Sequence, residues 1–255
     1  MTLADHRALA GIDVIVTRPA HLAEPFCARV EAHGGAPVRL PALQIDALPP
    51  PPSPGACDIA IFLSPNAVAF SSDLTLPRQA LVMAVGDKTA AGLRQRGIPQ
   101  IETPGEDSTS EGLLRTPALT HVAGKRILLV CGEGGRTLLQ EELTARGATV
   151  ERAEVYRRTI PALSRQHRQR ALARPDRCVL TLTSGDAARN LVEMMDSLAQ
   201  RTLFRLPLVA GSRRIARIAN DLGFQQPAEI ADNPGDEAMM TALLNLAARM
   251  TQRHE

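Results

Sequence analysis

The chain has 255 residues, of which 44% are hydrophobic and 22% are charged, and its formal net charge is +2. This length suits one large domain or two small ones, and no apolar run is long enough to span a membrane. The small net charge, together with only 2% aromatic residues, argues against a nucleic-acid-binding surface.

The first residues and the cysteines indicate the compartment. Residues 1–11 contain Asp5, His6 and Arg7 where a signal peptide would have its apolar core, so we expect a cytoplasmic protein. The four cysteines are scattered and form no C-x-x-C pair, which disfavours a disulfide framework and a zinc site. We expect most of them to be small buried residues and expect no metal.

Six near-continuous apolar runs are typical of strands that are buried on both faces. In chain order they are residues 13–16, 59–63, 81–85, 127–130, 179–182 and 207–210. Each run is followed by a polar or glycine-bearing turn and then by a helical pattern, clearest in 20–33, 137–146 and 187–199. This alternation predicts an α/β fold with parallel sheets and helices on both sides.

The second half of the chain repeats the first. The matching segments are 14–16 and 127–130, 59–66 and 179–186, and 82–87 and 208–212. A single duplication with such a long period is not a solenoid. It predicts two similar lobes, with a ligand-binding cleft between them.

Two extended segments interrupt the alternation at equivalent places in the two halves, residues 38–48 and 149–161. We expect them to form a two-stranded antiparallel linker that joins the lobes and permits hinge motion. The first lobe is then discontinuous and consists of residues 1–37 and 162–255. The second lobe is residues 49–148.

Ligands of open parallel sheets bind beyond the carboxyl ends of the strands. The turns expected there are 17–19, 64–66, 86–89, 131–136, 183–186 and 211–214. Each precedes a helix, whose backbone N–H groups can bind an anion. Ser, Thr, Asp and Asn also occur there as ordinary helix caps. Six such turns with several arginines favour a distributed polyanion site over any single turn.

Standard catalytic motifs are absent from the sequence, which has no complete G-x-G-x-x-G, no Walker lysine, no G-x-S-x-G and no H-E-x-x-H. Cys131 could act as a nucleophile at a helix N-terminus, but its counterpart in the first half is Thr17, which favours a small turn residue. Tyr156 is the one tyrosine of the chain. It is either a proton donor or an ordinary strand residue.

The order and spacing of several short motifs resemble the uroporphyrinogen-III synthase family. In the first half they are Val-Thr-Arg-Pro at 16–19, Phe-Leu-Ser-Pro-Asn-Ala-Val at 62–68, Ala-Val-Gly-Asp-Lys-Thr-Ala at 84–90 and Ser-Glu-Gly-Leu-Leu at 110–114. In the second half they are Cys-Gly at 131–132 with Arg136, Val-Tyr-Arg-Arg at 155–158, Leu-Thr-Ser-Gly at 182–185 and Val-Ala-Gly at 209–211. The resemblance spans roughly residues 12–245. It implies two α/β lobes joined by a two-stranded ladder, with no cofactor or metal.

The resemblance also implies a reaction. The linear tetrapyrrole hydroxymethylbilane, which carries acetate and propionate side chains, loses water and closes to uroporphyrinogen III with its last pyrrole ring inverted. Loss of the hydroxyl gives a cationic azafulvene, and a spiro intermediate allows the inversion. The substrate also closes without an enzyme to the uninverted isomer, so catalysis should consist mainly of positioning and exclusion of that path.

The resemblance assigns roles to individual residues. Tyr156 aligns with the family tyrosine that is the candidate to assist departure of the hydroxyl. We expect the substrate carboxylates to meet residues of the strand-end turns, namely Arg18, Ser64, Asn66, Thr89, Arg136, Ser184, Ser212 and Arg213. Many relatives have Gly-Pro-Thr-Thr where this chain has Gly-Ser-Arg-Arg at 211–214. The arginines there either bind carboxylates instead or point to solvent, and Arg18 is either a substrate contact or a structural residue.

Two other function classes remain open from the sequence. One is a two-lobed binding or regulatory module that closes on an anionic metabolite without chemistry, and Tyr156 argues against it because a pure binder needs no phenol there. The other is a nucleotide-sugar transferase, which the small lobes and missing fingerprint disfavour. As partners we expect a polycarboxylate tetrapyrrole, no nucleic acid and no membrane. We expect a monomer, compatible with transient contact with the preceding pathway enzyme.

Overall fold

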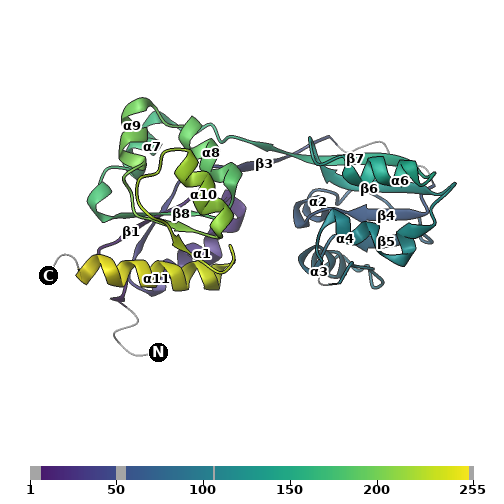
Figure 1. Cartoon of the computed structure of the whole chain (residues 1–255), viewed down its shortest axis with the longest axis horizontal. Helices are drawn as coiled ribbons and strands as arrows, with labels where there is room; N and C mark the ends of the chain where they lie inside the picture. The colour runs from purple at the N-terminus through teal and green to yellow at the C-terminus, as the bar shows by residue number, and fades with distance from the viewer. Residues whose placement is uncertain (1–6, 50–55, 106, 253–255) are drawn as a thin grey trace. The chain divides into compact units, whose positions relative to one another are not determined.

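The computed structural model describes residues 7–49, 56–105 and 107–252 and consists of two compact units (Figure 1). Unit 1 comprises Met1–Gln44 and Thr159–Glu255, and unit 2 comprises Ile45–Arg158. The chain therefore passes from one unit to the other twice. Within the described residues each unit is built on one five-stranded sheet.

The sheet of unit 1 is parallel throughout and has the order β10-β9-β8-β1-β2. Its strands are β1 (Asp13–Val16), β2 (Ala36–Arg39), β8 (Cys178–Leu182), β9 (Leu208–Ala210) and β10 (Glu229–Ile230). The three central strands β9, β8 and β1 are buried along their whole length. Burial on both faces explains their continuous apolar runs.

Helices cover both faces of this sheet. They are α1 (Ala20–Ala32), α7 (Arg165–Ala171), α8 (Gly185–Glu193), α9 (Ser197–Leu203), α10 (Arg213–Asp221) and α11 (Asp236–Gln252). Val14 and Val16 pack with α1 and α11 in one core, whereas Ile15 packs with α7 to α10 in another. Successive residues of a strand point to opposite faces, so the two helical layers sandwich the sheet.

The sheet of unit 2 has the order β3-β7-β6-β4-β5. Its strands are β3 (Gln44–Ala47), β4 (Ile59–Phe62), β5 (Leu81–Ala84), β6 (Arg126–Gly132) and β7 (Thr149–Thr159), and its helices are α2 (Pro65–Ala69), α3 (Asp87–Gln95), α4 (Ser110–Leu114), α5 (Pro117–Thr120) and α6 (Leu138–Ala145). The pairs β7–β6, β6–β4 and β4–β5 are parallel. One core lies on the α2 and α3 side and the other on the α4 to α6 side. The prediction of an α/β fold with parallel sheets is confirmed.

The strand orders agree with the internal repeat. β1 lies between β2 and β8, and its counterpart β6 lies between β7 and β4. β8 and β9 are neighbours in unit 1, as their counterparts β4 and β5 are in unit 2. Each unit therefore combines strands from both halves of the chain.

The two segments expected to form the linker, 38–48 and 149–161, contain strands of the two sheets, and a strand of one segment is the hydrogen-bonded neighbour of a strand of the other. Residues 36–39 are β2 and pair with β1, and β7 pairs with β6 over Thr149–Tyr156. β3 is the hydrogen-bonded neighbour of β7 at the edge of the unit 2 sheet. β2 and β3 are partly exposed, as edge strands are. This partial exposure explains the loose alternation of apolar and polar residues in the first of the two segments.

Candidate active site

Serine hydroxyls cap the helices that follow three central strands. Ser64 follows β4, Ser184 follows β8 and Ser212 follows β9, and all three have extended backbones. The Ala67 N–H donates to Ser64 Oγ over 3.0 Å, the Ala187 N–H to Ser184 Oγ over 3.0 Å, and the Ile215 N–H to Ser212 Oγ over 3.3 Å. Each hydroxyl accepts a bond as a cap and still has its own hydrogen to donate.

Tyr156 lies beside the Ser64 cap. The register of β7 on β6 shifts between Cys131 and Gly132, so Gly132 pairs with Tyr156. The Tyr156 hydroxyl is 3.1 Å from Ser64 Oγ, and Arg158 Nη2 donates to it over 3.3 Å. The phenol of Tyr156 is thus joined to a helix cap and to a guanidinium, all within unit 2.

The ring of Tyr156 is held by close packing. Its side chain is 2% exposed, and its ring centroid is 6.1 Å from that of Phe70. Arg158 Cζ lies 5.6 Å from the centroid of the tyrosine ring. A Cβ atom on Gly132 would lie 2.5 Å from Tyr156 Cζ. Only glycine at position 132 leaves room for the phenol in this position.

Three other expected contacts belong to unit 2 and differ in exposure. Arg136 is exposed and donates to Glu111 Oε1 over 2.9 Å. A backbone hydrogen bond, and to a smaller extent Arg136, lower the pKa of Glu111. Asn66 is half-buried in α2, whereas Thr89 in the first turn of α3 is only 2% exposed.

Arg18 is bound within unit 1. Its guanidinium forms an ion pair with Asp236 at the first residue of α11, donates to the Pro234 carbonyl oxygen over 3.0 Å, and lies 4.9 Å from the ring centroid of Phe26. Of the two roles expected for Arg18, these contacts support the structural one.

Guanidinium groups gather at the start of α8 in unit 1. Arg213 and Arg214 are exposed in the first turn of α10. A Cβ atom on Gly185 would lie 3.3 Å from Arg189 Nη1 and 3.8 Å from Arg214 Nη1. Arg189 and Arg158 were not predicted from the sequence. Their spacing in the sequence could have indicated them. Arg189 is one helical turn after Gly185, and Arg158 is two residues after Tyr156, on the same face of one strand.

The expected residues are therefore divided between the two units. Unit 2 holds Tyr156, Ser64, Asn66, Thr89 and Arg136, and unit 1 holds Arg18, Ser184, Ser212 and Arg213. The contact that the structure resolves between two of them is that of Tyr156 with Ser64.

The cysteines are not activated nucleophiles. All four are buried and unpaired, and burial raises the pKa of each thiol. Cys131 follows this pattern despite its place at a strand end, which agrees with a small packed turn residue. In the part of the chain that the structure describes, no group of three metal-ligating side chains occurs, and no helix has the length and apolarity needed to cross a bilayer.

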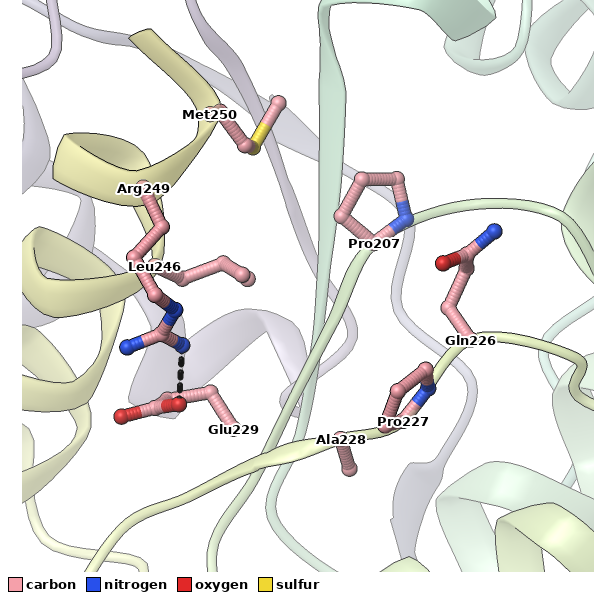
Figure 2. Close-up of a pocket in the computed structure, with 8 residues that line it drawn as sticks. All are labelled: Pro207, Gln226, Pro227, Ala228, Glu229, Leu246, Arg249 and Met250. Carbon is pink, nitrogen blue, oxygen red and sulfur yellow. Dashed lines mark hydrogen bonds and ion pairs between the residues drawn. The ribbon is translucent and has the colours of Figure 1, made fainter. Parts of the chain in front are cut away.

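A hollow of about 250 Å³ lies in unit 1 beside the amino ends of β9 and β10 (Figure 2). It is lined by Pro207, which precedes β9, by Glu229, the first residue of β10, and by the α11 residues Leu246, Arg249 and Met250. Arg249 and Glu229 form an ion pair across it. This hollow lies at the amino ends of β9 and β10, whereas Ser212 lies beyond the carboxyl end of β9. It is therefore not part of the strand-end site.

The fold and these side chains define an α/β protein in which serine hydroxyls cap the helices after central strands in both units, and the buried phenol of Tyr156 lies beside one of these caps. The chain belongs to the uroporphyrinogen-III synthase family. The family model "Uroporphyrinogen-III synthase HemD" matches residues 24–241.

Curated relatives carry the same name. The chain is 31% identical over 247 residues to the uroporphyrinogen-III synthase of Escherichia coli K12, and the match covers 91% of this chain and 100% of that protein. It is 33% identical over 248 residues to the Salmonella typhimurium LT2 enzyme of that name, again covering 91% and 100%.

Solved structures share the fold. The synthetase from Helicobacter pylori matches with a TM-score of 0.63 and 17% identity over 92% of this chain and 99% of that one. A mutant uroporphyrinogen III synthase from Thermus thermophilus matches with a TM-score of 0.60 and 19% identity over 93% and 99%. At these identities the structural likeness establishes the fold alone.

Proposed function

We propose that this chain closes hydroxymethylbilane to uroporphyrinogen III and that Tyr156 assists the departure of the hydroxyl group. Membership in a family of haem-biosynthesis enzymes supports the reaction. The observation that carries the residue assignment is the phenol of Tyr156, whose oxygen lies 3.1 Å from Ser64 Oγ and 3.3 Å from Arg158 Nη2.

The phenol can supply the proton that the leaving group needs. As the carbon–oxygen bond of the hydroxymethyl group breaks, the phenolic hydrogen passes to the departing oxygen and water leaves. The bond electrons leave with that oxygen, and the pyrrole nitrogen stabilises the azafulvene cation. After ring closure and inversion, the proton released when the pyrrole regains its aromaticity returns to the phenolate. The cycle loses one water and involves no net oxidation or reduction.

The strand-end turns suit a polycarboxylate. In unit 2 we assign substrate contacts to Ser64, Asn66, Thr89 and Arg136, and in unit 1 to Ser184, Ser212 and Arg213. Helix N-termini offer N–H donors to carboxylates, and arginine binds them with two parallel hydrogen bonds. Arg213 is exposed and is therefore accessible for the role of the threonines that many relatives carry in this turn.

The internal repeat supports a further part of the proposal. Because equivalent caps occur in both units, the same kind of turn is available for carboxylate contacts in each unit. We also propose that the enzyme is cytoplasmic and monomeric and that it contacts the preceding pathway enzyme transiently. The non-catalytic alternative has no observation of its own in its favour.

The test is product analysis with enzymatically generated hydroxymethylbilane. After oxidation, the porphyrin isomers are separated, and the type III isomer is expected to dominate. Formation of the type I isomer alone would overturn the proposed function.

Tyr156→Phe tests the assigned residue. It removes only the hydroxyl, so the far-ultraviolet circular dichroism should stay unchanged while kcat falls about 100-fold, the lower range for loss of a general acid. A kcat equal to that of the wild type would remove Tyr156 from the mechanism.

A further inference from the structure

We infer that Arg158 is a positioning residue that directs the phenolic hydrogen of Tyr156 toward the substrate. This inference rests on the proposed function, since it assumes that Tyr156 donates a proton. It adds a residue and a physical role that the order of the sequence motifs does not provide.

The hydrogen bonds around the phenol determine where its hydrogen points. Ser64 Oγ accepts the Ala67 N–H over 3.0 Å and lies 3.1 Å from the Tyr156 oxygen, where either hydroxyl can be the donor. Arg158 can only donate, and it does so to the same oxygen over 3.3 Å. When Ser64 is the donor, both acceptor positions of the phenol oxygen are filled and its own hydrogen points in a third direction. A leaving hydroxyl in that direction receives it.

Charge supports the same role. The phenol oxygen becomes negative as its proton leaves, and a fixed cation beside it stabilises that charge. Arg158 provides the cation from the exposed side, while the ring itself is 2% exposed. Because Gly132 and Phe70 hold the ring, the rotation of the O–H bond is the main freedom left. Arg158 restricts that freedom.

The neighbouring arginine is a natural control. Arg157 is also exposed, but its guanidinium lies 3.6 Å from the Glu133 carboxylate and not at the phenol. Arg157→Gln and Arg158→Gln therefore remove the same charge one residue apart on one strand. The long-range electrostatic effect of the two changes is similar, and only Arg158→Gln removes a bond to Tyr156.

The first measurement observes the phenol directly and needs no substrate. The chain has one tyrosine and no tryptophan, so tyrosine labelled with ¹³C at Cζ gives a single resonance, and the intrinsic fluorescence comes from Tyr156 alone. Arg158→Gln should shift the Cζ resonance and change the fluorescence. Arg157→Gln should leave both as in the wild type.

The second measurement is kinetic. Arg158→Gln should lower kcat about tenfold with KM changed by less than about threefold, whereas Arg157→Gln should leave both within about twofold. Arg158→Lys keeps a charged donor and should recover most of the loss. In the Tyr156→Phe background, Arg158→Gln should lower kcat no further, because the two residues act as one unit.

Two results would overturn the inference. One is equal behaviour of the two glutamine variants in resonance and kcat. The other is an undiminished effect of Arg158→Gln in the Tyr156→Phe background, which would make Arg158 an independent substrate contact. If a glutamine variant does not fold, the inference is tested with Arg158→Lys and with the Tyr156 Cζ resonance of the wild type at increasing salt concentration. A wild type that forms only type I product would instead refute the proposed function, and the resonance comparison would still test the contact.

Discussion

At the scale of single residues, the four thiols show how burial controls chemistry. Cys178 is 1% exposed, and burial raises its pKa from 9.0 to about 11. The nearby Asp13 contributes to this increase in the pKa, and Arg174 opposes it. The folded state therefore keeps this thiol neutral at a pH where the unfolded chain ionises it.

This shift predicts a dependence of stability on alkaline pH. Below pH 9.0 the thiol is protonated in both states, so its contribution is constant. Between pH 9.0 and about 11 the unfolded state loses the proton first, and the free energy of unfolding should fall by about 2–3 kcal/mol from this residue. Urea denaturation at the two ends of this range measures it. Cys178→Ala should flatten the decrease, and an equally steep decrease in that variant would contradict the assignment.

Residue contacts also limit what could be predicted from the sequence. The motif order was enough for the family and for Tyr156 as a candidate, because those depend on residue type and spacing. The bond of Tyr156 to Ser64 depends on the parallel register of β4, β6 and β7, which no local pattern encodes. For the same reason Arg158 was missed, and Arg18 could not be assigned until its ion pair with Asp236 was known.

At the scale of elements, the buried strands were predictable and the edges were not. The six apolar runs became β1, β4, β5, β6, β8 and β9, because burial on both faces leaves a continuous apolar pattern. The helical pattern at 187–199 predicts one helix, but the structure divides this segment between α8 and α9. Asp196 caps α9 by accepting the Ala199 N–H over 3.0 Å, and a cap of this kind could have indicated the break.

The β6–β7 pair gives a prediction at this scale. Gly132→Ala places a methyl group 2.5 Å from the present position of Tyr156 Cζ, so the ring must move. We expect kcat to fall at least about tenfold with a smaller loss of stability, since the end of a strand can adjust. The rate of type III isomer formation measures kcat, and the tyrosine fluorescence reports the movement of the ring.

Gly92→Ala is the matched control. Gly92 lies within α3, and a Cβ atom there would make an ordinary contact 3.4 Å from Val68 Cγ1. Alanine favours a helix by roughly 0.5–1 kcal/mol over glycine, so this variant should be active and at least as stable as the wild type. Wild-type kcat in Gly132→Ala would show that the ring position does not matter.

At the scale of the whole molecule, the two units differ in how the chain builds them. Unit 2 is one continuous segment with two cores of its own. Unit 1 needs both ends of the chain, because β1 lies between β2 and β8. The difference follows from the repeat, in which each half supplies strands to both sheets.

Continuity predicts that residues 45–158 fold as an isolated fragment. The fragment should unfold cooperatively in urea and should show the tyrosine fluorescence of the full chain, since Tyr156 and its contacts all belong to it. Residues 1–44 alone should be unfolded, because β1 then lacks β8. If the fragment 45–158 unfolds without a cooperative transition, unit 2 is not an independently stable folding unit.

The pairing of β1 with β8 also has a consequence during synthesis. Thr17 Oγ1 donates to the Thr181 carbonyl oxygen over 2.7 Å, and the two residues are 164 positions apart in the chain. At about 5–20 residues per second, the ribosome makes that stretch in on the order of 10 to 30 s. The apolar strand Asp13–Val16 thus leaves the ribosome long before its partner exists, while unit 2 is completed in the interval. During that time the apolar side chains of this strand lack the β8 strand beside them and are available to a chaperone.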